Sequence, residues 1–139
     1  MISAMINAVI FDGESLLDEH AVIIKEGRVE QVLPQSQLPT TVQVGVDLKG
    51  NYLTPGFIDL QVNGGGGVLF NSSPTVDAIR AIGEAHRQYG TTGFLPTLIT
   101  DDFDVMVEAV SAVADALAQG VPGVLGIPVS YTHLRAHET

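Results

Sequence analysis

Residues 54–67 have the sequence TPGFIDLQVNGGGG, and this stretch separates two kinds of predicted structure. Pro55 and Gly56 mark a turn, because proline fixes φ and glycine leaves it free. Residues 57–62 form a short, mostly apolar run, which is typical of a buried strand. Strand patterns precede the stretch, and alternating helix and strand patterns follow it. We therefore expect an all-β part to meet an α/β part here.

Three polar residues interrupt the apolar run at every second position: Asp59, Gln61 and Asn63. Side chains two apart on a strand share a face, so the spacing predicts a polar stripe that leads into glycines 64–67. Such a stripe at the end of a buried strand is where an α/β enzyme places its chemistry. The glycines predict a tight loop, and no Gly-Lys-Ser or Gly-Lys-Thr follows to make a Walker loop.

Residues 1–53 predict short strands that form part of a β-sandwich without chemistry of its own. The runs 21–24 and 29–32 are joined by Lys-Glu-Gly-Arg, which predicts a hairpin. Residues 42–48 alternate apolar and polar side chains, which predicts a half-buried strand.

Beyond residue 73 the apolar spacing becomes helical. Ser73 is the predicted N-cap of a first helix that ends at Gly90. A strand is expected at 92–99, with Pro96 marking its end or a bulge. The next helix is predicted to start at Thr100 or Asp101, with one apolar face, and a further strand at 124–127. The residues of that face are Phe103, Met106, Val110, Val113 and Leu117. Alternating strands and helices imply parallel pairing with right-handed crossovers.

Three motifs carry a resemblance to a known family: PGFIDLQVNGGGG at 55–67, FN at 70–71 and PTLIT at 96–100. Together they resemble the N-acetylglucosamine-6-phosphate deacetylases of the amidohydrolase superfamily, over roughly residues 1–127. The resemblance implies an α/β fold in which a small β-sandwich segment (1–53) precedes the first strands and helices of a (β/α)8 TIM barrel (54–127). A complete barrel needs about 250 residues, so we expect the 139-residue chain to be an N-terminal fragment.

The same resemblance implies an activity for the complete enzyme. It would hydrolyse the N-acetyl amide of N-acetylglucosamine 6-phosphate to acetate and glucosamine 6-phosphate, with one divalent metal, zinc or similar. Such an enzyme is expected to be a homo-oligomer that binds a phosphorylated amino sugar. The metal ligands of the family are a Glu after strand three and two later histidines, and its catalytic Asp lies on strand eight. We therefore expect no catalytic residue, metal ligand or cofactor in this chain, and no activity from it alone.

Gln61 and Asn63 occupy the positions where most amidohydrolases carry His-x-His. Neutral amides are poor zinc ligands, and some members of the deacetylase family have this replacement and keep a single metal. The interpretation is that both residues line the active site and order water or the groups around the metal. The alternative is that they only satisfy buried backbone groups. Asp59 is expected to be structural, and isolated His86 to be a packed core residue.

Composition excludes several classes of protein. The net charge is −10, and the six basic residues are scattered, so a nucleic-acid surface is not expected and phosphate-binding cations should lie in other sequence. The chain has no cysteine, which excludes a disulfide scaffold and a Cys-ligated zinc site. Neither a signal peptide nor an apolar run of roughly 20 residues is evident, so we expect a cytoplasmic protein without a membrane partner.

Two alternatives to the deacetylase remain open. A different amidohydrolase, of the cyclic amidase type, would be expected to carry His-x-His at 61 and 63, which this chain lacks. A catalytically silent, amidohydrolase-like scaffold is the other, and sequence beyond residue 127 would separate all three.

Residues 128–139 break the pattern, since strand three of the family runs into His-x-Glu-Gly-Pro and Pro-Val-Ser stands here. We interpret this tail as non-native, translated adapter sequence. Its His133, His137 and Glu138 have the spacing of a helical zinc site, but two histidines without a partner cluster are too few.

Overall fold

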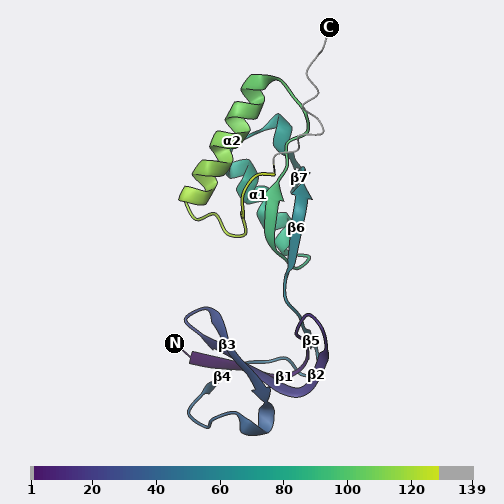
Figure 1. Ribbon diagram of the computed structural model, residues 1–139, viewed down its shortest axis with the longest axis vertical. Coiled ribbons are helices and arrows are strands. Elements are labelled where there is room, and N and C mark those ends of the chain that lie inside the picture. Colours follow the sequence, from purple (N-terminus) through teal and green to yellow (C-terminus); the bar gives the residue numbers. More distant parts are fainter. Residues whose placement is uncertain (1, 129–139) are drawn as a thin grey trace. The chain divides into compact units, whose positions relative to one another are not determined.

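The computed structural model describes residues 2–128, which form two compact units that divide after Pro55 (Figure 1). The first unit is built from strands, and the second alternates strands with helices. The chain is therefore mixed α/β, with its sheet-rich part at the N-terminal end.

The first unit is one five-stranded sheet with strand order β3-β2-β1-β4, in which β5 also pairs with β1. Its elements are β1 (Ile2–Phe11), β2 (Leu16–Lys25), β3 (Arg28–Pro34), the 3-10 turn η1 (Gln35–Gln37), β4 (Gln43–Asp47) and β5 (Tyr52–Leu53). The β1–β2 and β2–β3 pairs are antiparallel, whereas β4 and β5 run parallel to β1. A second layer, which a sandwich requires, is not formed by residues 2–55.

The hairpin predicted at residues 25–28 is confirmed. Lys25 pairs with Arg28, and the two residues between them, Glu26 and Gly27, have φ of 52° and 78°. Two successive positive φ values define the type I′ turn, whose twist matches that of the flanking strands. An exposed ion pair of 3.3 Å joins Lys25 to Glu30 beside this turn.

The strand expected at 42–48 forms as β4, but the prediction that it is half-buried is wrong. All five residues of β4 are exposed, and Val44 and Val46 keep 47% and 42% of their surface. β4 lies at the edge of the sheet, where it pairs with β1 alone. The small core of this unit instead gathers around Ala8, Ile10 and Val22.

The second unit begins with a parallel pair of strands, β6 and β9, and helix α1 lies in the connection between them. Its elements are β6 (Phe57–Val62), β7 (Gly64–Gly65), β8 (Val68–Leu69), η2 (Phe70–Ser72), α1 (Val76–Arg87), β9 (Thr91–Pro96) and α2 (Phe103–Ala118). A single parallel bridge joins Phe94 to Val124, where a third strand is predicted. β9 ends at Pro96, as expected for a residue that cannot donate a ladder hydrogen bond.

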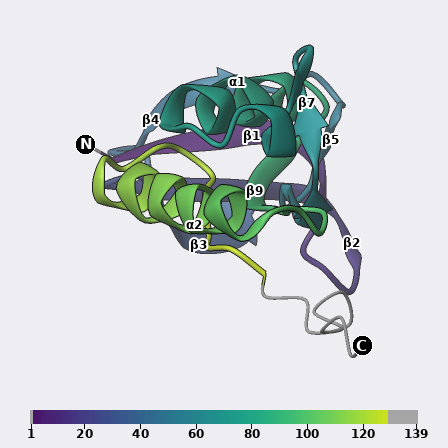
Figure 2. The same cartoon turned by 90° about the horizontal axis from the view of Figure 1, so that it is seen from above.

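Both helices pack on the same side of the β6–β9 pair (Figure 1) and against each other (Figure 2). The core between them contains Phe70, Ile79, Ile82 and Phe94, all at most 2% exposed. Gly83 of α1 allows this contact, because a Cβ there would lie 2.8 Å from the Phe94 ring.

Helix α1 starts later than Ser73, so the predicted cap is wrong. Thr75 is the N-cap, and its Oγ1 accepts a hydrogen bond of 3.2 Å from the backbone N–H of Ala78. The 3-10 turn η2 occupies residues 70–72, so the helix begins further along the chain. The second helix is likewise displaced, with Asp102 at its N-cap.

The face predicted for the second helix is wrong for three of its five residues, since only Val113 is buried and Met106 is half-buried. The buried residues of α2 are Ala109, Ala112, Val113 and Ala116, whereas Phe103, Val110 and Leu117 are 73%, 53% and 46% exposed. These alanines belong to the same core cluster as Ile79 and Ile82 of α1. The large side chains project from the flank of the helix, which residues 2–128 do not cover.

Strand β6 was expected to be buried, and most of it is exposed. Phe57, Ile58 and Leu60 keep 67%, 61% and 67% of their surface, and Val62 alone is buried. The reason is that β6 is hydrogen-bonded on one side only, to β9. Its composition matches a buried strand, but the second neighbour that would bury it is not among residues 2–128.

Candidate functional site

The candidate site lies where the two parallel strands end. Val62, the last residue of β6, pairs with Pro96, the last residue of β9. Two segments meet at this end: the β7–β8 hairpin that follows β6, and the loop 97–102 that follows β9. Loops at the carboxyl ends of parallel strands carry the chemistry of α/β proteins, so this edge is the natural place for a site.

A bulge in β6 changes the predicted polar stripe. Asp59 pairs with Phe94, and Val62 pairs with Pro96. Between these two pairs β6 advances by three residues and β9 by two, so β6 contains one extra residue. One extra residue turns the following side chains to the other face of the strand. The extra residue lies between Asp59 and Val62, so the regular alternation from which one shared face was predicted is interrupted there.

Asp59 helps to form this bulge. Its Oδ1 accepts the backbone N–H of Gln61 at 3.0 Å. This hydrogen bond gives the backbone N–H of Gln61 a partner where the bulge interrupts the pairing of β6 with β9. The structural role predicted for Asp59 agrees with it.

Gln61 and Asn63 flank Val62, whose side chain is buried against the helices. Gln61 is exposed, and Asn63 is half-buried. That both residues line an active site stays a prediction.

Asn63 is already engaged at the end of β6. Its Nδ2 donates to the backbone carbonyl of Thr97 at 3.1 Å. The backbone carbonyl of Asn63 accepts the N–H of Phe70 at 2.8 Å. With one hydrogen of Nδ2 bonded to Thr97, the side-chain oxygen Oδ1 is available to a ligand as an acceptor. Asn63 thus presents a hydrogen-bond acceptor at this edge.

Asn71 is a second amide at the site, and the sequence interpretation gave it no role. Its Oδ1 accepts the N–H of Ile99 at 2.9 Å, and its Nδ2 donates to the carbonyl of Ile99 and to Oδ2 of Asp101, each at 2.8 Å. The signal in the sequence was its place in the Phe-Asn motif at 70–71. Its partners lie about thirty residues further along, out of reach of a local pattern.

The contact with Asn71 also affects the Asp101 carboxylate. The hydrogen bond from Asn71, with a further one from the backbone N–H of Asp102, lowers the pKa of Asp101 below its ordinary value. Both donors favour the charged form. The carboxylate is therefore an anion beside the start of α2, where the helix dipole also stabilises negative charge.

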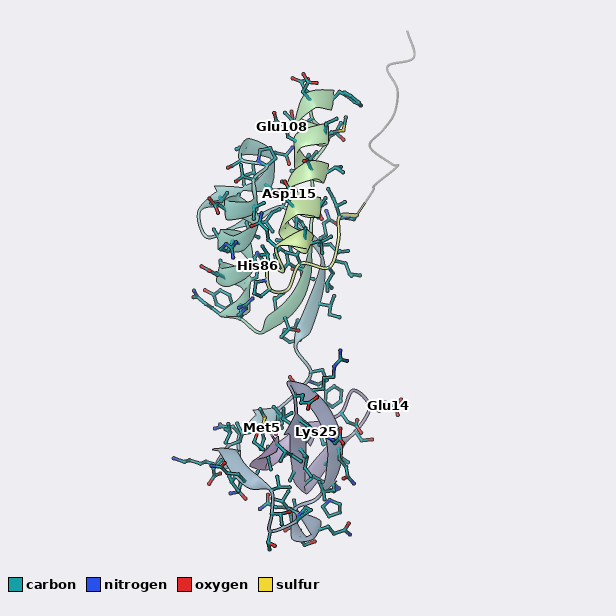
Figure 3. The ribbon with its side chains drawn as sticks, turned by 90° about the vertical axis from the view of Figure 1, so that its left-hand side faces the viewer. Met5, Glu14, Lys25, His86, Glu108 and Asp115 are labelled. Carbon is teal, nitrogen blue, oxygen red and sulfur yellow. The ribbon has the colours of Figure 1, made fainter. Side chains whose placement is uncertain are left out.

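The glycine run forms the tight loop that was predicted. Gly66 and Gly67 have φ of 61° and 81° and make the two-residue turn between β7 and β8. A Cβ on Gly64 would meet the carbonyl of Val68, and one on Gly65 would lie 2.9 Å from the His86 ring. His86 itself packs under the hairpin, with Nε2 2.9 Å from the carbonyl oxygen of Gly64 (Figure 3).

The described residues do not form a metal centre. Within residues 2–128, no three side chains of His, Cys, Asp or Glu come together in a group able to hold a metal ion. Gln61 and Asn63 supply only neutral amides. His133, His137 and Glu138 lie outside the described residues.

No helix among residues 2–128 is both long and apolar enough to cross a lipid bilayer.

Comparison with known proteins gives consistent matches for both units. The family described as NagA composite domain matches residues 3–53. The N-acetylglucosamine-6-phosphate deacetylase of Haemophilus influenzae is 39% identical over 131 residues, which cover 94% of this chain and 34% of that protein. The N-acetylgalactosamine-6-phosphate deacetylase of a Shewanella species is 53% identical over 87 residues, which cover 63% of this chain and 22% of that protein.

A solved structure matches the fold as well. The crystal structure of N-acetylglucosamine-6-phosphate deacetylase from Pasteurella multocida superimposes with a TM-score of 0.81 at 38% identity, covering 86% of this chain and 31% of that one. The chain thus spans roughly a third or less of the length of the proteins it matches.

Proposed function

We propose that this chain, an N-terminal segment of the N-acetylglucosamine-6-phosphate deacetylase family, is the part of such an enzyme that carries the first strands of its barrel. The complete enzyme would hydrolyse the N-acetyl amide of an N-acetylhexosamine 6-phosphate to acetate and the amino sugar phosphate. The observation that carries this proposal is the 39% identity to the Haemophilus influenzae deacetylase across 94% of the chain.

The arrangement of the second unit supports a barrel that continues beyond it. β6, β9 and the bridge at Val124 follow one another in sequence and in space, all parallel. A (β/α)8 barrel is built in this order. The exposed apolar residues of β6 suit a strand that gains a second neighbour when the barrel closes.

Gln61 and Asn63 would line the mouth of this barrel. An amide does not ionise near neutral pH, so neither residue can act as the general acid or base. Asn63 Oδ1 can accept a hydrogen bond from water or from a sugar hydroxyl, and its bond to Thr97 fixes that orientation. Their part in the reaction is to orient, and the proton transfers fall to residues elsewhere.

By family resemblance, the complete enzyme would hold one divalent metal, which would polarise the amide carbonyl. The described residues do not fit a site for it, because their donor set is two amides without a cluster of charged ligands. We therefore expect one metal per subunit, held by residues outside 2–128. Metal analysis of the complete protein checks this. Two tightly held metals per subunit would contradict it and make Gln61 and Asn63 candidate metal ligands.

The sugar epimer is a second question that the comparisons raise. The Shewanella relative, at 53% identity, is an N-acetylgalactosamine-6-phosphate deacetylase. The Haemophilus influenzae relative, which matches over more residues, is an N-acetylglucosamine-6-phosphate deacetylase. The two substrates differ only at the sugar C4 hydroxyl. Sites that hydrogen-bond a hydroxyl discriminate strongly against a substrate that presents it wrongly.

The experiment is acetate release by the complete protein from both epimers, compared through kcat/KM. Release from either supports a sugar phosphate deacetylase, and the larger kcat/KM identifies the epimer. Release from neither, by a protein that is folded and loaded with metal, would contradict the proposal and favour a cyclic amidase or a silent scaffold. Under the same proposal the 139-residue chain alone releases no acetate above a control without enzyme.

The complete enzyme is further proposed to be a cytoplasmic homo-oligomer. Its substrate is a charged sugar phosphate, which does not cross a membrane unaided, so the enzyme would act where that phosphate is formed. Light scattering of the complete protein gives the number of subunits.

A further inference from the structure

The loop 97–102 is held by side-chain amides from both ends of the β7–β8 hairpin. Asn63 precedes the hairpin and bonds to the carbonyl of Thr97, while Asn71 follows it and bonds to both peptide groups of Ile99. The backbone N–H of Thr97 also donates to the carbonyl of Val62 at 2.8 Å. The hairpin and the loop therefore form one hydrogen-bonded unit at the carboxyl ends of β6 and β9.

Within this unit Asn71 acts as a substitute strand. One side-chain oxygen and one side-chain nitrogen bond to the N–H and C=O of the same residue, Ile99, as a paired strand residue would. The second hydrogen of Nδ2 reaches Asp101. A carboxylate of the same size retains the acceptor but loses both donor contacts, and it adds a negative charge beside Asp101.

The held segment starts directly after β9, on the edge where a barrel enzyme binds its substrate. Ile99 is 52% exposed, so its side chain contributes little burial to fix the loop. The amide contacts of Asn71 thus define where the peptide of Ile99 lies.

From these contacts we propose that Asn71 is a positioning residue for the substrate wall formed by residues 97–101. This rests on the proposed function, because it assigns the wall to the sugar phosphate site of that enzyme. Asn71 does not touch the reacting amide. It sets the loop against which the bound substrate packs, and so acts on substrate binding more than on the chemical step.

The test uses the complete protein with Asn71→Ala and the near-isosteric Asn71→Asp, against Asn51→Ala as a matched control. Asn51 donates a similar amide hydrogen bond, of 2.9 Å, to the carbonyl of Leu48 in the first unit. Two readouts are taken: hydrogen exchange of the backbone amides in 97–101, and KM and kcat for the preferred sugar phosphate. The exchange readout does not depend on activity, so it tests the amide contacts even if the enzyme proves not to be a deacetylase.

Both Asn71 variants should exchange faster in 97–101 and raise KM by about tenfold or more, with kcat within about threefold, which is the pattern of lost uniform binding. The Asn51→Ala protein should keep its KM and its exchange in this loop. Unchanged exchange in both Asn71 variants would overturn the amide contacts. Faster exchange with unchanged KM would overturn the positioning role, and so would a fall in kcat alone. If Asn71→Ala does not fold, Asn71→Asp decides by the same criteria.

Discussion

Asp59 Oδ1 accepts the backbone N–H of Gln61 at 3.0 Å, at the place where β6 gains one residue relative to β9. This local contact lies where the regular alternation of β6 is interrupted. Beyond it Val62 enters the core, while Gln61 is exposed and Asn63 is half-buried. The backbone of Gln61, a predicted site residue, is thus held by a carboxylate that is expected to be structural.

Replacing Asp59 by alanine should disturb this arrangement. The variant loses the acceptor for the Gln61 N–H, which costs about 1 kcal/mol of folding free energy, and it permits the strand to shift its register. We expect Asp59→Ala to lower kcat/KM of the complete protein as well as its melting temperature. Asp59→Asn retains a side-chain oxygen and should remain close to the unmodified protein. If Asp59→Ala matches the unmodified protein in both measurements, the bulge does not depend on this contact.

The close packing of the glycine hairpin on His86 gives a second prediction. An added methyl at Gly65 would lie 2.9 Å from the His86 ring and push it from its bond with the Gly64 carbonyl. Gly65→Ala should therefore cost about 1 kcal/mol, the typical value of one hydrogen bond. In a His86→Ala background the same change should cost clearly less, because the ring is gone. Thermal unfolding of the four proteins gives the coupling energy, and a value near zero would show that the two residues act independently.

The position of the helix cap is tested by two neighbouring substitutions. Thr75→Ala removes the side-chain oxygen that accepts the N–H of Ala78 and should destabilise the protein by about 1 kcal/mol. Ser73→Ala, at the cap predicted from the sequence, should change the melting temperature little. Thr75→Ser keeps the oxygen and serves as the control. The reverse order of effects would restore Ser73 as the functional cap.

These contacts show which features the sequence could reveal. The Glu26-Gly27 turn and the strand end at Pro96 follow from the backbone preferences of single residues, and both were predictable. The bulge in β6 depends on how two strands pair, and the bonds of Asn71 join residues about thirty positions apart. Periodicity carries no information on either.

Burial was predicted less well, for a related reason. The apolar spacing of Phe103, Val110 and Leu117 marks a surface that needs a partner, and it does not say whether residues 2–128 contain that partner. The alanines of α2 were overlooked, because a small side chain is a weak signal of burial. Close helix packing nevertheless selects such residues.

The exposed apolar residues of the second unit predict the behaviour of the 139-residue chain in isolation. β6 exposes Phe57, Ile58 and Leu60 and pairs on one side only, and α2 exposes Phe103 and Leu117. Unpaired strand edges and apolar patches promote association. We expect the purified chain to aggregate, as measured by size exclusion with light scattering. A monomer with one sharp, cooperative melting transition would contradict this.

Charge on the apolar flank of α2 should reduce that association. The double change Phe103→Lys and Leu117→Lys places cations on the exposed patch and should raise the soluble fraction of the chain. Ser111→Lys adds the same kind of charge at an exposed polar position of the same helix, so it is the control. Equal improvement by the control variant would show that the effect does not depend on the apolar patch.

Gln61 and Asn63 differ in their contacts, and this separates a lining role from a structural one. Asn63 donates to the Thr97 carbonyl and is half-buried, whereas Gln61 is exposed. In the complete protein, Asn63→Ala should lower both kcat/KM and stability, the latter by about 1 kcal/mol for the lost hydrogen bond. Gln61→Ala should leave the free energy of unfolding within about 0.5 kcal/mol, as is usual for exposed positions, and still reduce kcat/KM by tenfold or more if its amide orients water or substrate. Steady-state kinetics and denaturant unfolding of the two variants give the four values. A Gln61→Ala enzyme with unchanged kcat/KM would remove Gln61 from the site, and an Asn63→Ala enzyme that loses stability but no activity would leave Asn63 with a purely structural role at the end of β6.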